Sequence, residues 1–481
     1  MKKTFILSLL TTCLTIFPGC KKFLDINKDP NNAEDVPVAY LLPSAQAAIS
    51  FSVGNTLGLM GGIWSQYWTQ SPSASQYRPL DQYSPDPGAF GNVWETLTSD
   101  ALEDLQQVID KSTVQKKSQY TAIALILKVY TFQLVTDLWG DVPFTEALKG
   151  EENISPVYDR QSDIYNHLVK TLDDAMALIN PDDPNAPGGD DLIYGGDMER
   201  WAHFANTLKL KIGLRLAKKD PVRAAAVVRT LAGKIFLQED ETAMQRFNAT
   251  GGQQNPLYGA ISAGLGGVSN LVASATTVDF FNRYNDPRIA AFYAPVPSGS
   301  YAAIPQGSYE TYISNDPLSK PSARTGANVD LSASALAPVK WMTSYESSFL
   351  QAEAVVRGWL PGDAAALYLD GIQQSFDAYA TGGFDDYAAQ PEIAFPAGGS
   401  VETKIAAIIT QKWAAMCGNQ NIEAWTEWRR TGYPSFFIES KASIIGAGRF
   451  PQTFLYPNSE LTRNPNAPRQ HLIYEKVWWA Q

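Results

Sequence analysis

Two stretches of the sequence place large aromatic rings beside polar side chains, which is the combination that binds sugars. The first stretch contains Trp64, Trp68 and Tyr77, and the second contains Tyr258, Tyr301 and Tyr312. Sugars lay their apolar CH faces on aromatic rings while amide, carboxyl or guanidinium groups bond their hydroxyls. We therefore predict that the two stretches converge on one ligand-binding surface. The alternative is that the tryptophans belong to the core and the tyrosines are ordinary loop packing.

Residues for metal or nucleophilic chemistry are not grouped in the sequence. The histidines His167, His203 and His471 stand far apart, and neither HExxH nor CxxC occurs. These are the spacings by which zinc sites are recognised. The G-x-S-x-G turn of many hydrolases is also missing. The GLGG run at Gly264–Gly267 lacks the third glycine of a dinucleotide loop, so we predict no cofactor.

Acidic residues are abundant, but no motif selects a functional pair. The loop Pro181–Asp191 fails as a calcium-binding EF-hand from Asp183, because Pro187 and Tyr194 stand at ligand positions. A glycosidase would need two carboxylates across a cleft, and nothing singles out two of the 49 acids. The sequence therefore predicts a protein that is not an enzyme.

The N-terminus predicts export and lipid attachment. Lys2 and Lys3 precede an apolar run too short to span a bilayer, and Gly19 precedes Cys20. We predict a signal peptide over residues 1–19, lipidation at Cys20 and a polar tether over residues 20–37. The alternative is ordinary secretion with Cys20 as a free thiol. After cleavage Cys417 has no partner for an intramolecular disulfide if Cys20 is acylated.

Composition favours a large globular body. Of 481 residues, 45% are apolar and 18% are charged, which suits a substantial core. The net charge of −11 argues against nucleic acid as a partner. We expect one domain over residues 38–481.

Apolar residues recur at helical spacing over most of the chain, which predicts a mainly α-helical fold. The expected helical segments are residues 38–68, a stripe from Trp94 to Val108, residues 120–138, and stripes beginning at Ile164 and Trp201. A later pair, divided by Pro361-Gly362, resembles a repeat unit. Between about residues 238 and 339 the periodicity lapses except near Thr277–Tyr284. So long an irregular segment is expected to be functional or to have structure of its own.

The stretch from Gln411 to Pro434 is expected to form two helices that meet at Gly418. Trp425 and Trp428 are three apart and share a face. Gly432 and Pro434 end the second helix. Arg429 and Arg430 at its end are more easily explained by ion pairs within the fold than by an anion site.

Several motifs resemble the SusD/RagB family. They are Q-N-I-E-A-W-x-x-W-R-R-T-G-Y-P near the C-terminus, C-K-K-F-L-D-I-N-x-D-P-N from Cys20, D-P-R at Asp286–Arg288, I-P-Q-G at Ile304–Gly307 and Y-G-G-D-x-x-x-W from Tyr194. The resemblance covers nearly the whole chain. It implies a degenerate tetratricopeptide-like helical scaffold that carries a loop-rich ligand-binding half.

The same resemblance implies a function. Members are surface lipoproteins of the outer membrane that bind a nutrient and deliver it to a SusC-like TonB-dependent transporter. We therefore expect a non-catalytic protein that binds a glycan or oligosaccharide. Some members bind peptides and some bind calcium, so a peptide ligand and a structural calcium stay open. An exported polysaccharide-degrading hydrolase and a scaffold without ligand are the alternatives from other classes.

Overall fold

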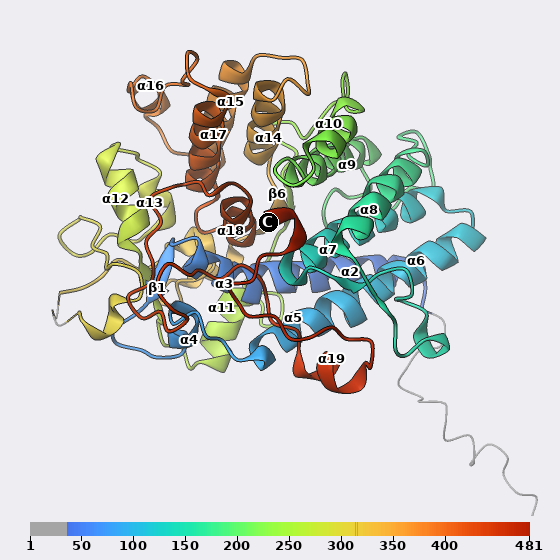
Figure 1. The fold of residues 1–481 in the computed structure, drawn as a ribbon, viewed down its shortest axis with the longest axis horizontal. Helices are drawn as coiled ribbons and strands as arrows, with labels where there is room; N and C mark the ends of the chain where they lie inside the picture. The colour runs from blue at the N-terminus through green and yellow to red at the C-terminus, as the bar shows by residue number, and fades with distance from the viewer. Residues whose placement is uncertain (1–35, 313, 315) are drawn as a thin grey trace, which may run out of the picture. The chain divides into compact units, whose positions relative to one another are not determined.

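The computed structural model describes residues 36–481 except 313 and 315. The predicted signal peptide, Cys20 and the tether up to residue 35 lie outside the described residues. Residues Val38–Gln481 form one compact unit (Figure 1). Helices dominate it, so the prediction of a mainly α-helical fold is confirmed.

The longer helices alternate with short turns along the chain. They are α2 (Val38–Gly54), α3 (Thr56–Trp64), α6 (Glu103–Val114), α7 (Ser118–Trp139), α8 (Gln161–Met176), α9 (Met198–Arg215), α10 (Pro221–Arg229), α12 (Ala275–Arg283), α14 (Ser344–Val356), α15 (Ala364–Ala378), α17 (Val401–Met416) and α18 (Asn421–Thr431). The short helical segments are α4 (Arg78–Asp81), η2 (Pro87–Phe90), α5 (Gly91–Glu95), η3 (Thr96–Leu102), η4 (Gly150–Glu152), α11 (Pro256–Gly259), η5 (Ala260–Gly264), α13 (Ile289–Phe292), η6 (Ser308–Glu310), η7 (Ala323–Thr325), η8 (Ser332–Leu336), α16 (Phe384–Ala388), α19 (Asn458–Arg463) and η9 (Trp478–Ala480).

Consecutive helices pack as neighbours, as a degenerate helical repeat requires. Helices α6 to α10 contact one another in order, and α14 packs on both α15 and α17 (Figure 1). Gly371 allows the close approach of α14 and α15, because a Cβ there would lie 2.9 Å from the Phe349 ring. Helix α7 is long and apolar enough to span a membrane, but most of it is buried inside the protein. It is therefore a core helix, which packs on α6, α8 and α9.

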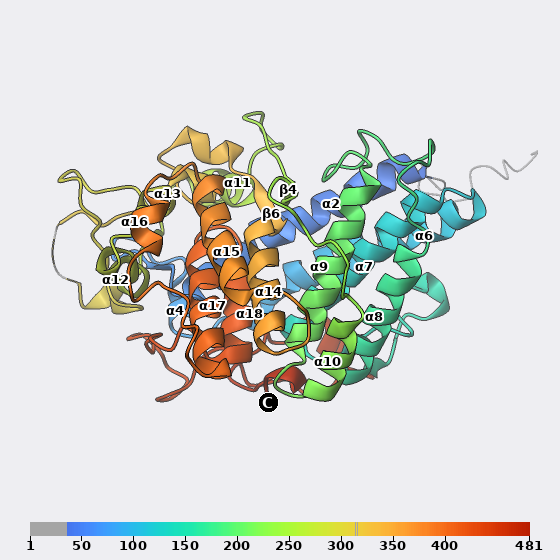
Figure 2. The same ribbon diagram turned by 90° about the horizontal axis from the view of Figure 1, so that it is seen from above.

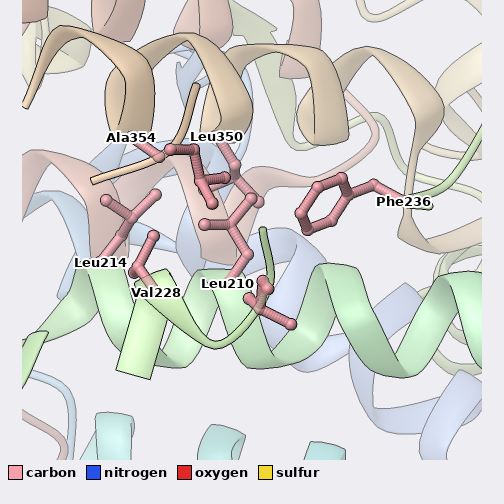
Figure 3. Packing of buried hydrophobic residues seen from close by; sticks show 8 residues of the cluster. Leu210, Leu214, Val228, Phe236, Leu350 and Ala354 are labelled. Atoms are coloured by element: carbon pink, nitrogen blue, oxygen red, sulfur yellow. The ribbon is translucent and has the colours of Figure 1, made fainter. Parts of the chain in front are cut away.

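One apolar cluster joins α9 to α14, two helices that are far apart in the sequence. Leu210 and Leu214 of α9 meet Leu350 and Ala354 of α14, with Phe236 beside them (Figure 3). These residues recur every four positions along each helix, so each pair lies on one face. Burial of such a face is the main contribution to the association of α9 with α14.

The strands are short and form three antiparallel pairs. They are β1 (Trp68–Gln70) with β5 (Leu271–Ala273), β2 (Val142–Pro143) with β3 (Tyr158–Asp159), and β4 (Ala243–Gln245) with β6 (Val339–Met342). The first pair joins the N-terminal helices to the irregular segment, with Trp68 opposite Ala273. In the third, Met244 and Lys340 are partners. This β4–β6 pair lies beside α2 (Figure 2).

The prediction that the first helical segment continues to Trp68 is wrong. Helix α3 ends at Trp64, and Gln66 takes a positive φ of 60° that reverses the chain. The reversal is stabilised from outside the segment, because the Gln66 side chain donates to Ile438 O and accepts from Thr276. Trp64 and Trp68 consequently do not share a helix face.

The C-terminal helix pair has the predicted boundaries. Helix α17 ends at Met416 and Gly418 takes a φ of 73°, while Gly432 caps α18 with a φ of 81°. A Cβ at Gly418 would lie 2.4 Å from Thr325 Cγ2, so the close turn favours glycine. Trp425 is fully buried and Trp428 is partly buried.

A network of buried charges surrounds α18. Glu427 contacts Arg215, Lys412 and Arg430, and Arg430 also contacts Glu353 at 2.6 Å. Burial alone would raise the pKa of the Glu427 carboxyl, but the charges of Arg430, Lys412 and Arg215 outweigh it and hold that pKa well below its usual range. The prediction that the arginines form structural ion pairs therefore holds for Arg430. Arg429 instead donates to backbone oxygens of Asp137 and Gln452.

Candidate ligand-binding surface

A buried carboxylate fixes the irregular segment to the first helices. Asp81 of α4 accepts hydrogen bonds from Thr69 Oγ1 at 2.8 Å and Gln70 N at 2.7 Å. Its second oxygen accepts from Gln306 Nε2 at 2.6 Å. Burial raises the pKa of the Asp81 carboxyl to about 6, against the lowering effect of these three donors. Loop 70–81 and the I-P-Q-G motif are therefore held at one point.

Gly307 follows in the same motif and completes this junction. Its N–H donates to Thr69 Oγ1 at 3.0 Å, and its φ of 73° favours glycine. A Cβ at this position would lie 2.0 Å from Ser440 Oγ. The C-terminal loop thus packs directly over the junction.

The D-P-R motif forms a second junction, on α15 and α17. The Arg288 guanidinium pairs with Asp286 at 2.6 Å and donates to Ser375 and Gln411. It also lies 4.8 Å from the centre of the Phe376 ring. The middle of the irregular segment is consequently tied to the helical scaffold at two points by buried polar contacts.

Loop 70–78 also meets other residues of the irregular segment, among them the buried Tyr309 and Asn270. The Arg78 guanidinium lies 5.0 Å from the centre of the Tyr309 ring and 3.6 Å from a Glu310 oxygen. On the other side Asn270 Oδ1 accepts from Gln76 N at 3.2 Å. The structure therefore brings parts of the two predicted stretches together, with a guanidinium and a carboxylate beside an aromatic ring.

Four of the predicted ligand tyrosines are partly exposed. They are Tyr77, Tyr258, Tyr301 and Tyr312. Within the described part of the chain none of them makes a ring–ring contact. Burial raises the pKa of the Tyr77 hydroxyl to about 12 and raises that of Tyr301. The hydroxyls of Tyr77 and Tyr301 are therefore neutral at physiological pH and can both donate and accept hydrogen bonds.

The four tyrosines occupy different elements. Tyr77 precedes α4, and Tyr312 follows η6, the turn that carries Tyr309. Tyr301 lies just before Ile304, which bridges to Ser274 beside β5. Tyr258 lies on α11, which packs on α2, α3 and η8. The structure thus shows a direct junction between loop 70–78 and η6, and Tyr258 on α11 is not part of that junction.

The two predicted tryptophans belong to the core. Trp64 is 4% exposed, its ring lies 4.9 Å from that of Trp425, and its indole N–H donates to Leu80 O. Trp68 is 1% exposed. A stacked sugar needs an open ring face, and neither tryptophan has one. Trp64 and Trp68 are therefore not part of a ligand-binding surface.

Sequence reasoning missed a cavity of about 890 Å³ beside α11. Its wall includes Ala47, Ala48 and Phe51 of α2, residues 245–248 at and after the end of β4, residues 252–254, and Pro256 and Gly259 of α11. Phe51 is 47% exposed, which is unusual for a phenylalanine on a packed helix. Ligand cavities commonly measure about 300–1,000 Å³ and are mostly apolar. The cavity lies where α2, the segment after β4 and α11 meet, and no local pattern indicated that meeting.

The acidic loop at Pro181–Asp191 has a structural role for its last residue. Asp191 accepts hydrogen bonds from Gln46, from Trp201 and from Gly196 N. Across residues 36–481, with 313 and 315 excepted, no group of three or more His, Cys, Asp or Glu side chains is arranged to hold a metal.

Comparison with known proteins identifies the family to which this fold belongs. A family profile described as "Starch-binding associating with outer membrane", SusD-like, matches residues 30–457. The chain belongs to the SusD-like family. The expected family is thus confirmed over most of the chain. No curated protein matches it significantly.

Solved structures of SusD homologues have the same fold. One from Bacteroides uniformis is 24% identical, with a TM-score of 0.78, and the match covers 92% of this chain and 99% of that one. A chitin-binding SusD homologue from Flavobacterium johnsoniae is 23% identical, with a TM-score of 0.76 and coverage of 92% and 98%. A further similar structure is described as a chitin-binding protein. At this identity the likeness establishes the shared fold.

Proposed function

We propose that this protein is a non-catalytic, lipid-anchored surface protein that binds a glycan and delivers it to a SusC-like TonB-dependent transporter. Membership of the SusD-like family over residues 30–457 carries the proposal, because that family is described as starch-binding and outer-membrane-associated. The chitin-binding homologues with the same fold support a glycan ligand. The predicted lipid at Cys20 would attach the protein to the membrane.

The proposed contact surface contains Tyr77, Tyr258, Tyr301 and Tyr312. Its support is their partial exposure and freedom from aromatic packing. Arg78, which follows Tyr77 in the chain, meets Glu310, which lies two residues before Tyr312, and the two supply a charged donor and acceptor for sugar hydroxyls. The buried hydrogen bond from Gln306 to Asp81 holds the two loops together without a ligand. Such preorganisation lowers the entropic cost of binding.

Calorimetry with single alanine variants tests this surface. N-acetylglucosamine oligomers are the first probe and starch oligosaccharides the second. Removal of a stacked tyrosine is expected to weaken binding by about 1–3 kcal/mol without lowering the melting temperature. Tyr40 of α2 is 70% exposed and lies outside the proposed surface, so Tyr40→Ala is the matched control. Unchanged affinity in all four variants, or losses that track lower melting temperatures, would refute the assignment.

A further inference from the structure

Lys340 of β6 is a buried cation without a protein anion. It is 7% exposed, and its ammonium lies 4.4 Å from the centre of the Tyr379 ring and 5.8 Å from that of Tyr345. Among the described residues no carboxylate lies within ion-pair distance of it. The buried lysines Lys211 and Lys412 differ, because each contacts Glu346. A buried charge is costly unless it is paired, so Lys340 lacks the partner that this protein gives its other buried lysines.

A cavity of about 480 Å³ adjoins Lys340. It lies between the β4–β6 pair, the turns η7 and η8, and the end of α15, which contributes Tyr379. Its charged lining residues are Lys340, Arg324 and Arg246 against Glu239 and Asp240. Three cations and two acids leave one positive charge when Lys340 is protonated. This balance matches a monoanion better than a phosphate dianion.

We propose that this cavity binds the carboxylate of an acidic sugar, with Lys340 as its buried cationic partner and Arg324 as a second donor at the rim. The choice of a sugar rests on the proposed glycan-binding function. The remaining lining fits one sugar residue. Ala337 and Pro338 offer an apolar wall to the CH face of the ring.

Two polar groups of the lining can bond sugar hydroxyls. Thr242 Oγ1 accepts a hydrogen bond from Ser344 N, and its own O–H has no acceptor within the described chain. Asn419 donates to Cys417 O through its amide nitrogen, which leaves its amide oxygen as an acceptor. The cavity thus offers contacts for a carboxylate, for one face of a sugar ring and for two sugar hydroxyls. A sugar that carries all three features is a uronic acid.

Proton uptake accompanies this binding. Burial, and then the charge of Arg324, lowers the pKa of Lys340 to about 7. The flanking hydroxyls of Tyr345 and Tyr379 stay neutral, because burial raises the pKa of both. A bound carboxylate favours the charged amine and raises its pKa again. Above pH 7 each ligand therefore brings one proton with it, and affinity falls about tenfold per pH unit.

Calorimetry with glucuronic acid and glucose tests the inference on the full mature chain. We expect glucuronic acid to bind at pH 6.5 and more weakly at pH 8.5. At pH 8.5 the apparent enthalpy should depend on the buffer, because a proton is taken up. Lys340→Met should weaken this binding at least 20-fold and abolish the buffer dependence. Arg324→Gln should weaken binding a few-fold and retain the dependence.

Lys320→Met is the matched control, because Lys320 is partly exposed and pairs with Asp330 outside this cavity. It should bind glucuronic acid as the wild type does. A melting curve of Lys340→Met tests whether the variant is folded, and only a variant that melts as the wild type does is compared. Equal affinity of Lys340→Met and wild type would overturn the proposal, as would the absence of glucuronic acid binding. Binding of a tripeptide with a free C-terminus but not its amide, without glucuronic acid binding, would assign the cavity to peptides and also overturn it.

The inference and the proposed function can fail separately. Binding of neutral oligosaccharides without glucuronic acid would refute the acidic-sugar cavity and leave the tyrosine surface standing. Lys340-dependent binding of glucuronic acid without any neutral oligosaccharide would support the cavity and refute the tyrosine surface.

Discussion

At the scale of single residues, Glu427 holds three cations of the buried network together. Arg430, Lys412 and Arg215 approach it from three helices, α18, α17 and α9. Removal of one partner from such a network leaves uncompensated charge in a medium of low dielectric constant. Glu427 is buried among these cations, so its role is structural.

The first prediction concerns this carboxylate. Glu427→Gln preserves the shape of the side chain but removes the negative charge from among three cations. We expect a loss of about 3–5 kcal/mol in the free energy of unfolding, measured by urea denaturation at pH 7. Glu152→Gln replaces an exposed acid and should change stability by less than about 0.5 kcal/mol. Equal stability of both variants would contradict the network.

The second prediction concerns Asp81 and pH. Its pKa is about 6 in the folded protein against a usual value of 3.8, so the folded state binds this proton more tightly than the unfolded chain. The resulting stability is full below about pH 4 and is lost as pH rises through 6. The expected loss is about 3 kcal/mol, from 1.36 kcal/mol per pKa unit.

Asp81→Asn isolates this contribution. The variant cannot ionise at this position, so its stability should fall less than that of the wild type between pH 4 and pH 7. The comparison uses the difference in pH dependence, since lost hydrogen bonds change the absolute stability as well. Denaturation curves at several pH values provide the measurement. Parallel profiles for wild type and variant would show that Asp81 has an ordinary pKa.

At the scale of elements, the third prediction concerns the junction at Gly307. Gly307→Ala introduces a Cβ that meets Ser440 and the Ala442 nitrogen, at a φ of 73°. Gly299→Ala is the matched control, because its φ is 85° but the space around it is open. The control should lose about 1 kcal/mol, and Gly307→Ala about 1–3 kcal/mol more. Thermal unfolding of both variants decides this, and equal losses would mean that the C-terminal loop yields easily.

Helices with strong apolar periodicity were predictable from sequence. The stripes at Ile164, Leu168 and Leu172 and at Trp201 and Phe204 are buried as expected, because the pattern of a helix face is local. Helix α12 was likewise visible within the irregular segment.

Non-local contacts set the features that sequence did not reveal. The reversal at Gln66 is held by Thr276 and Ile438, and it moved Trp68 from a helix into a strand. Trp64 and Trp68 are core residues because of partners that are distant in the sequence. Helix α18 packs on α3, which ends at Trp64, and Trp68 of β1 pairs with Ala273 of β5. The cavity beside Lys340 is lined by β4 and β6, which pair although nearly a hundred residues of chain separate them. No local motif therefore marks it.

At the scale of the whole molecule, the fourth prediction concerns anchoring and assembly. Mass spectrometry of the membrane-bound form should find an acylated Cys20 at the N-terminus. Mild detergent extraction should copurify a TonB-dependent transporter at near-equal stoichiometry. Cys20→Ser should release the protein from the membrane. A mature soluble form that begins at another residue would contradict the anchor, and recovery of a lone lipoprotein in several detergents would contradict the assembly.

We propose that this SusD-like protein binds a glycan without cleaving it. The most direct measurement is calorimetric titration of the mature protein with N-acetylglucosamine and starch oligosaccharides, followed by chromatography of the ligand recovered after long incubation. We expect saturable binding to at least one oligosaccharide and recovery of that ligand at its original length. Shortened products, or a folded protein that binds no oligosaccharide, would contradict the account.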